Sequence, residues 1–465
     1  MNGFVNVIVK HRKFIIVIFI LITLVCAILQ MFVGVNYNLV DYLPPEAQST
    51  KAIRIMDDEF SQAMPNASVM VNDVSIIEAL EYKKQLADIE GVSDVLWLDD
   101  AADVKIPLRM LDASLTEKYY IDGAALFSVT IEEGLENIAC AAIRKLIGDG
   151  NALSGPAVDT DFMQNASTSE VINAMFILIP ICIIILMLST DSWIEPLLFL
   201  CAIGVSVMIN MGTNIFFGQV SFLTNSVSPL LQLAVSMDYA IFLLHSFTDN
   251  RQRYDNVEDA MKQAIKSSMT AISASALTTL FGFLALVFME FKIGADLGII
   301  LAKGIIFSFI SVVVFLPALT LCIYKVIDCT RHRSLLPNFR NVSRPLSKVA
   351  VPTIVIVSLI IVPCFLGQRR TAFVYGAGSA GKGTYLERDV KAIEKKFGKS
   401  TLIALLVPVG DIVKEHDLSL EIESLDHVST VMSYANTVGS TVPISFLSSD
   451  ITERFYSDNY ARIII

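Results

Sequence analysis

Charged residues are scarce in this sequence of 465 amino acids. Asp, Glu, Lys and Arg make up only 17% of the chain, whereas soluble proteins carry about 25%. Hydrophobic residues reach 54%, and the mean hydropathy is +0.60. This composition excludes an ordinary soluble protein, because so much apolar surface needs a membrane to cover it.

Paired cysteines and an excess of basic residues are also missing. The seven cysteines are scattered without a Cys-x-x-Cys pair, which argues against a disulfide framework or a zinc site. The formal net charge of −11 excludes a general nucleic-acid-binding footprint. We therefore expect no metal, no cofactor, no nucleic-acid partner and no enzymatic activity.

Seven apolar segments are long enough to cross a bilayer as helices, which takes about 20 residues. They are Phe14–Val35, Val171–Leu188, Ile194–Phe216, Phe222–Phe247, Thr270–Met289, Leu297–Tyr324 and Val349–Gly367. The first is too long for the apolar part of a signal peptide and lacks a small-residue cleavage site. It is therefore expected to remain as an anchor, and 171–324 is expected to form a five-helix bundle.

The basic residues predict the orientation of these segments. With residues 1–13 inside, the inner loops and the linker 325–348 collect the lysines and arginines, whereas the short outer loops hold only Lys292. Two long polar segments, 36–170 and 368–465, are then expected outside. The first of them carries 24 acidic and 9 basic residues.

The first polar segment alternates strand-like and helix-like patterns. Two strand–helix–strand units are predicted, at Ala67–Asn72, Ile76–Ile89 and Val92–Leu98, and at Ala124–Glu132, Glu133–Ile147 and Asn151–Ala157. Two such units predict a ferredoxin-like α+β domain.

An internal repeat relates the two polar segments. Residues 89–129 align without gaps to 425–465, at an offset of 336, with ten of 41 positions identical. The alignment includes LTEKYYID at 115–122 and ITERFYSD at 451–458. The first and seventh apolar segments correspond in the same way, so the chain is expected to be a parallel duplication.

The second copy is incomplete in this chain. Counterparts of the helices at 171–324 would begin near residue 507 at the same offset, beyond the 465 residues present. We expect a truncated piece of a protein of about 670 residues or more, because an isolated terminal strand is a poor stopping place. Such a piece is expected to insert in a membrane without transporting.

A helix, a large polar domain and five helices, all duplicated, resemble the resistance–nodulation–division (RND) superfamily. Residues 218–247, GQVSFLTNSVSPLLQLAVSMDYAIFLLHSF, resemble the fourth helix of its MMPL branch, in which an Asp-Tyr pair precedes an apolar run. Residues 267–286, SSMTAISASALTTLFGFLAL, resemble the fifth helix of that branch. The resemblance covers the whole chain.

The resemblance implies an exporter of hydrophobic or amphiphilic, lipid-like or drug-like molecules that is driven by the proton-motive force. It would be a multi-pass protein of a bacterial plasma membrane, with the N-terminus inside and both polar domains outside. Its partners would be the bilayer, the substrate and protons, and it could be an oligomer. The alternatives of the same architecture are a sterol-sensing or Patched-like lipid receptor and a Sec-type protein-export accessory.

Asp238 and Tyr239 are the candidate proton relay. An ionised carboxylate inside an apolar helix costs several kcal/mol, so Asp238 is expected to gain and lose a proton near neutral pH beside the Tyr239 hydroxyl. Ser275, Thr278 and Thr279 form a seam with Gly282 on the next helix and are the expected relay neighbours. Without a second bundle, Asp238 is expected to face lipid or a vacant groove.

Three further polar features receive structural interpretations. Asn210 and Asn214 are expected to cap helices near the outer interface, and Lys303 is expected to extend outward to that interface. The segment GAGSAGKGT at 376–384 fits a phosphate-loop pattern that includes Lys382. No nucleotide site is expected there, because the rest of a nucleotide-binding fold has no room around it.

Overall fold

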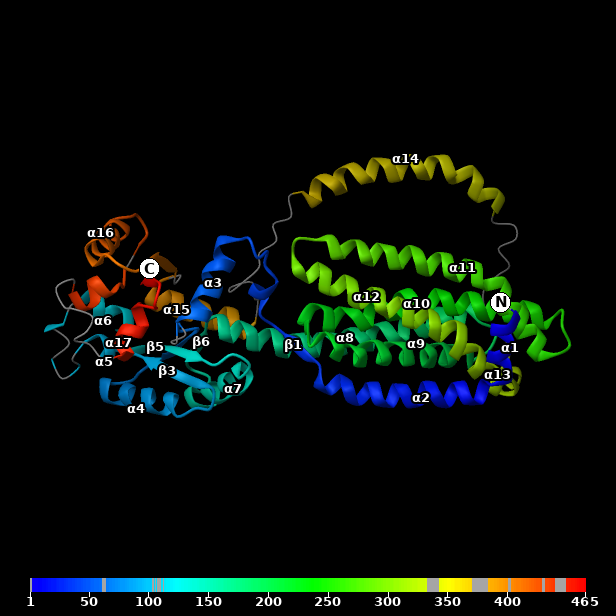
Figure 1. Cartoon of the computed structure of the whole chain (residues 1–465), viewed down its shortest axis with the longest axis horizontal. Helices are drawn as coiled ribbons and strands as arrows, with labels where there is room; N and C mark the ends of the chain where they lie inside the picture. The colour runs from blue at the N-terminus through cyan, green and yellow to red at the C-terminus, as the bar shows by residue number, and fades with distance from the viewer. Residues whose placement is uncertain are drawn as a thin grey trace. The chain divides into compact units, whose positions relative to one another are not determined.

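The computed structural model describes residues 2–60, 64–102, 104, 106, 110–111, 113–332, 343–369, 384–399, 403–428, 431–439 and 449–465. They form two compact units, shown in Figure 1. The helical unit is Met1–Tyr42 with Asn165–Phe373, and the sheet unit is Leu43–Gln164 with Val374–Ile465. Lys382, in the phosphate-loop pattern, lies outside the described residues.

The seven predicted membrane segments are confirmed as helices of sufficient length and apolarity. They run over Arg12–Phe32, Pro156–Ser189, Glu195–Phe217, Phe222–Arg251, Val257–Phe288, Lys292–Cys329 and Val351–Gln368. The corresponding elements are α2 (Arg12–Leu29), α8 (Pro156–Ser189), α9 (Glu195–Gly212), α10 (Phe222–Arg251), α11 (Val257–Ala285), α12 (Lys292–Ile310), α13 (Leu316–Cys329) and α14 (Ser343–Gln368). Short turns complete these spans: η1 (Gln30–Phe32), η4 (Thr213–Phe217), η5 (Leu286–Phe288) and the π-helical η6 (Ser311–Phe315).

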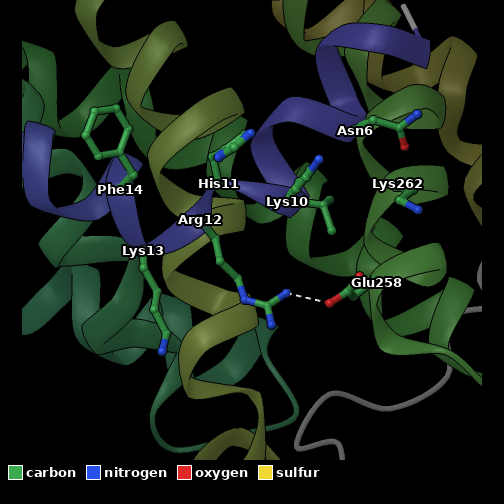
Figure 2. A pocket seen from close by; sticks show the side chains of 9 residues that line it. Asn6, Lys10, His11, Arg12, Lys13, Phe14, Glu258 and Lys262 are labelled. Atoms are coloured by element: carbon green, nitrogen blue, oxygen red, sulfur yellow. Dashed lines mark hydrogen bonds and ion pairs between the residues drawn. The ribbon is translucent and has the colours of Figure 1, made fainter.

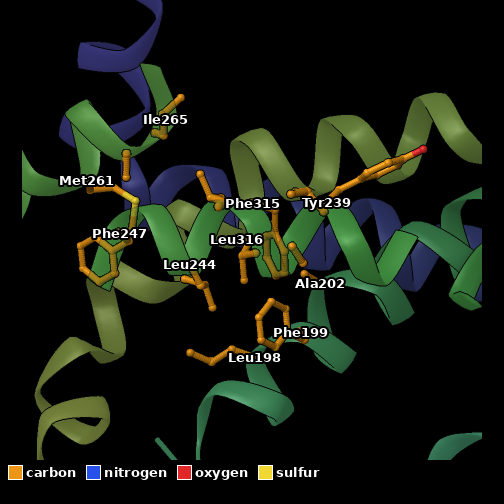
Figure 3. Close-up of a cluster of buried hydrophobic side chains, with 14 of the residues drawn as sticks. Leu198, Phe199, Ala202, Tyr239, Leu244, Phe247, Met261, Ile265, Phe315 and Leu316 are labelled. Carbon is orange, nitrogen blue, oxygen red and sulfur yellow. The ribbon is translucent and has the colours of Figure 1, made fainter. Parts of the chain in front are cut away.

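The interior of the helical unit is built from α9, α10 and the continuous α12–α13 helix. Half or more of the residues in the apolar stretches of these helices are buried, compared with about a tenth or less in α2, α8 and α11. Figure 3 shows the aromatic part of the core, where Phe199 of α9, Leu244 of α10 and Phe315 of η6 lie close together. By contrast, the α14 side chains from Val351 to Gln368 are all exposed.

The N-terminal residues form a helix of their own, α1 (Asn2–Lys10), which the apolar pattern did not predict. Val5, Ile8 and Val9 are buried, and α1 packs against α11 and α13. A short parallel pair, β1 (Gly34–Asn36) with β7 (Gln219–Ser221), and a turn, η2 (Leu39–Tyr42), complete this unit.

The sheet unit contains the two predicted strand–helix–strand units. The first is β2 (Ala67–Val71), α4 (Ile76–Ala87) and β3 (Val92–Leu96); the second is β5 (Ala124–Ile131), α7 (Glu136–Ile147) and β6 (Ala152–Ser154). The strand order is β3-β5-β2-β6, and every neighbouring pair is antiparallel. Between the two units lie α5 (Leu98–Ala101), α6 (Ala113–Tyr119) and β4 (Tyr120–Ile121), and α3 (Gln48–Glu59) precedes them.

The predicted repeat is confirmed by the strand register. β8 (Ala404–Pro408) pairs with β9 (Tyr460–Ile464), and Leu405 faces Ile463 as Val69 faces Phe127 in the first copy, at the same offset of 336. Two helices repeat in the same way: α16 (Ile412–Glu423) and α17 (Ser449–Phe455) begin and end 336 residues after α4 and α6 of the first copy. Two further elements belong to this second copy: α15 (Tyr385–Phe397) and η8 (Ala435–Gly439).

The two copies exchange helices within the sheet unit. From the second copy, α15 packs against β6 of the first, and Asp389, of which 1% of the side chain is exposed, pairs with Arg144 at 2.9 Å. From the first copy, Glu59 at the end of α3 accepts hydrogen bonds from Ser457 at 2.7 Å and Asn459 at 3.1 Å. The sheet unit is therefore one body that needs both halves of the sequence.

A buried arginine shows how closely the copies meet. Arg462 of β9 lies over the ring of Phe60, with 4.6 Å between the guanidinium carbon and the ring centroid. Burial, together with the charge of Arg454, lowers the pKa of Arg462 to about 10. The Arg462 Nε–H donates to the Arg454 carbonyl at 3.0 Å, so this buried cation has hydrogen-bonding partners despite its low exposure.

Candidate functional site in the helical unit

The start of α10 is fixed by its neighbour α12. The hydroxyl of Ser221 accepts a hydrogen bond from the backbone N–H of Thr224 at 3.1 Å, which is a helix N-cap. The carboxylate of Asp296 in α12 accepts from the Ser221 backbone N–H at 2.8 Å and from the Thr224 hydroxyl at 2.7 Å. A carboxylate at this end of a helix is also favoured by the helix dipole.

The Asp-Tyr pair lies sixteen and seventeen residues into α10, and its two side chains point in different directions. The Asp238 side chain is exposed on the described bundle, whereas only 1% of Tyr239 is exposed. Consecutive helical residues are about 100° apart around the axis, so one can face the core while the next faces out. The structure thus places Asp238 on the outer surface of the bundle and buries Tyr239 within it.

Tyr239 is brought together with two of the three expected relay neighbours. Its hydroxyl is directed at Ser275 and Thr279 of α11, but it forms no hydrogen bond of good geometry among the described residues. Figure 3 shows this hydroxyl pointing away from the apolar cluster in which the ring is packed. The buried Tyr239 hydroxyl thus lies beside two other hydroxyl groups, each of which can donate and accept a hydrogen bond.

The third expected neighbour, Thr278, is not part of this group. The Tyr239 hydroxyl is near Ser275 and Thr279 but not near Thr278, whose own hydroxyl donates to the backbone oxygen of Ala274 at 2.9 Å, as that of Thr279 donates to Ser275 at 3.0 Å. The seam expected to end at Gly282 does not extend that far, because a side chain added there would meet no atom within 4 Å. The buried positions of α11 run from Ala260 to Ala276, so its packed face ends before Gly282.

A second polar centre on α10 was missed from the sequence. We call it the inner cluster; its members are Ser206 and Asn210 of α9, Gln232 of α10, and Gly304 and Ser308 of α12. The Gln232 Nε2 donates to the Gly304 carbonyl and the Ser308 hydroxyl, both at 3.0 Å, and to the Ser206 hydroxyl at 3.3 Å. Its Oε1 accepts from the Asn210 Nδ2 at 3.0 Å. A glutamine inside an apolar segment was the available signal.

The capping interpretation of Asn210 is therefore wrong. Asn210 lies within α9, fully buried, and its side-chain amide bonds to Gln232 on the neighbouring helix. Gly304 makes this approach possible, since a Cβ there would come within 2.8 Å of the Asn210 amide nitrogen and 3.0 Å of the Gln232 oxygen.

Lys303 of α12 reaches the C-terminal end of the neighbouring helix α9. Its ammonium group donates to the Asn210 carbonyl at 3.0 Å and to the Asn214 side-chain oxygen at 2.5 Å, and it lies 5.1 Å from the centroid of the Phe217 ring. A cation at the C-terminal end of α9 complements the helix dipole. Lys303 therefore binds the C-terminal end of α9, and its extension outward to the membrane interface stays a prediction.

Comparison with known proteins decides the family. The model of the MMPL family matches residues 41–335, which is well over half of the chain. The chain belongs to the MMPL family. The matched range includes α10 and α11 and covers both the first polar segment and the helices from α8 to α13.

Three relatives illustrate the range of this MMPL protein's similarities. The protein MJ1562 of Methanocaldococcus jannaschii is 37% identical over 89 residues, or 19% of this chain and 23% of its own length. MmpL12 of Mycobacterium tuberculosis is 30% identical over 141 residues, which cover 30% of this chain and 12% of the relative. The sulfolipid-1 exporter MmpL8 of the same organism is 24% identical over 298 residues, which cover 60% of this chain and 27% of the relative. The chain thus matches only a part of each of these relatives.

Proposed function

We propose that this MMPL protein is a proton-motive-force-driven exporter of hydrophobic or amphiphilic, lipid-like molecules. The observation that carries the proposal is a carboxylate on a membrane helix, Asp238, next to Tyr239, whose buried hydroxyl has no hydrogen bond of good geometry among the described residues. Ionisable groups inside membrane segments are expensive and usually functional. That a relative, MmpL8, is named a sulfolipid-1 exporter supports the substrate class.

In this proposal Asp238 takes up and releases the driving proton, and Tyr239 with Ser275 and Thr279 passes it on or senses the charge. The exposed position of Asp238 suits a group that faces a further helix or a water-filled path. The coupling is conformational: neutralising Asp238 lets its face of α10 approach an apolar surface, and ionising it makes that contact unfavourable.

The same proposal assigns the sheet unit to the outer face of a bacterial plasma membrane, as a ferredoxin-like porter domain. The antiparallel order β3-β5-β2-β6 with two strand–helix–strand units supports the fold. The lysines and arginines of the short loops support the orientation, with the N-terminus inside.

The test replaces Asp238 by Asn in the protein expressed from its whole gene. Asn has nearly the same shape but cannot exchange a proton, so efflux of a fluorescent amphiphile such as N-phenyl-1-naphthylamine from energised cells is expected to fall more than about tenfold. A protonophore is expected to abolish the parental efflux and to leave the residual efflux of the variant unchanged.

The matched control is Asp249→Asn, which changes an exposed carboxylate three turns further along the same helix. This variant is expected to export at the parental rate. If the Asp238→Asn variant reaches normal levels in the membrane and exports the amphiphile at the parental rate, the proton-relay hypothesis is wrong. That result would favour the lipid-receptor or protein-export alternatives.

A further inference from the structure

The N-terminal end of the helical unit contains a cavity that the proposed export mechanism does not use. It has a volume of about 650 Å³, which lies within the range of small-molecule sites. Residues from two distant parts of the sequence line it, the α1–α2 junction and the beginning of α11 (Figure 2). They include Lys10, His11, Arg12, Lys13, Glu258 and Lys262.

The junction itself brings four basic or titratable residues to one place. α1 ends at Lys10, His11 interrupts the helix, and α2 starts at Arg12. Arg12 crosses to α11 and pairs with Glu258 at 2.6 Å, as Figure 2 shows. Both residues of this ion pair line the cavity.

The remaining lysines leave an excess of positive charge. Lys262 pairs with Asp259 at 3.0 Å on its own helix. Within the described ranges, neither Lys10 nor Lys13 forms an ion pair, and both are exposed. Of the charged residues that line the cavity, four are basic and one is acidic. Such a site favours an anion.

Exposed apolar side chains lie on the segment that carries the site, and one of them, Phe14, lines the cavity. On the α1–α2 segment, Phe4 is 49% exposed, Val7 is 55% exposed and Phe14 is 65% exposed. Val5, Ile8 and Val9 hold the opposite face of α1 against the bundle. A helix with a buried inner face, an exposed apolar face and basic residues at its end is typical of a segment that lies in the membrane interface.

We propose that this cavity binds the headgroup of an anionic phospholipid. The phosphate would accept hydrogen bonds from Lys10, Lys13 and Lys262, and the acyl chains would lie along Phe4, Val7 and Phe14. Basic residues on the inner side of a membrane protein also set its orientation, but that role needs only positive charge somewhere in the loop. Here basic residues from 10–13 and from position 262 line one cavity. Basic pockets between membrane helices bind anionic headgroups in this manner.

Native mass spectrometry of the whole protein tests the proposal. The purified protein is titrated with phosphatidylglycerol or with phosphatidylcholine in detergent, and the bound lipids are counted. We expect Lys262→Gln to weaken phosphatidylglycerol binding about fivefold, as expected for one lysine near an anionic headgroup. The Lys10→Gln/Lys13→Gln variant is expected to weaken it further, and phosphatidylcholine binding should not change.

Matched variants separate the cavity from general surface charge and from loss of fold. Lys325→Gln removes an exposed lysine of α13 that does not line the cavity, and it is expected to bind like the parent. Lys262→Arg keeps the charge and should restore binding. Lys10 and Lys13 are exposed, so their variants remain informative even where Lys262→Gln fails to fold.

Two results would overturn the proposal. The first is that the Lys10→Gln/Lys13→Gln variant binds phosphatidylglycerol as tightly as the parent does. The other is complete displacement of the lipid by millimolar sn-glycerol 3-phosphate, which would make the occupant a soluble phosphate ester. Neither result depends on export, so the proton-relay proposal stands or fails separately.

Discussion

Two polar centres on one helix, α10, contrast in how their α10 side chains are satisfied, although the Asn210 Oδ1 in the inner cluster also has no hydrogen-bond partner among the described residues. In the inner cluster, Gln232 is buried and its amide bonds to α9 and α12 on both its nitrogen and its oxygen. Six residues later, Asp238 is exposed and Tyr239 buries a hydroxyl without a good hydrogen bond in the described chain. Satisfied polar groups hold helices together, whereas unsatisfied ones remain available for a ligand or a proton.

The contrast follows from helix geometry. Positions 232, 236 and 239 are separated by four and three residues and share one face of α10, and all three are buried. Asp238 is about 100° away from that face. Stability is therefore expected to depend on the first centre and transport on the second.

The largest expected effect on stability comes from Gln232→Ala. It removes four hydrogen bonds, each worth about 0.6 kcal/mol on average in a membrane protein, so the free energy of unfolding should fall by about 2 kcal/mol. Asp238→Ala, the comparison variant, should change it by less than about 0.5 kcal/mol, because the Asp238 side chain is exposed and forms no hydrogen bond or ion pair to another helix in the described part of the chain. Unfolding by SDS in mixed micelles measures the stability of both variants. A larger loss of stability in Asp238→Ala than in Gln232→Ala would contradict the assignment of stability to the inner cluster.

Tyr239→Phe is expected to act on transport instead. The change removes only the hydroxyl that faces Ser275 and Thr279, so efflux of the amphiphile should fall about tenfold if that hydroxyl takes part in proton transfer. Because the hydroxyl forms no good hydrogen bond, stability should stay the same or rise slightly. If Tyr239→Phe markedly lowers the free energy of unfolding and leaves efflux unchanged, Tyr239 has a structural role and does not take part in proton transfer.

A pair of glycine substitutions gives the smallest and most local comparison. Gly304→Ala places a Cβ against Asn210 and Gln232, and such overpacking costs about 1 kcal/mol or more. Gly282→Ala meets no atom within 4 Å and should stabilise by about 0.5 kcal/mol through helix propensity. The same SDS unfolding series measures both variants. Equal effects would show that the inner cluster is not tightly packed at Gly304.

Much of the architecture could be predicted from linear properties of the sequence. Apolar runs predicted seven membrane helices, and alternating patterns predicted two strand–helix–strand units, because both depend on residues close in the chain. The offset of 336 predicted the pairing of β8 with β9, since a repeated sequence repeats its local structure. The α1 helix was missed because its apolar residues are too few to span a membrane.

The positions of the polar side chains depended on packing between distant segments. Gln232 and Ser308 are 76 residues apart, and Arg12 and Glu258 are 246 residues apart, so no local pattern indicated that they meet. The sequence by itself identified Asp238 and Tyr239 as unusual residues of an apolar helix. The family resemblance added the expectation that Asp238 faces outward. Only the tertiary structure decided that Tyr239, and not Asp238, is the residue beside Ser275 and Thr279 of α11, because the neighbours of α10 determine which of its sides is covered.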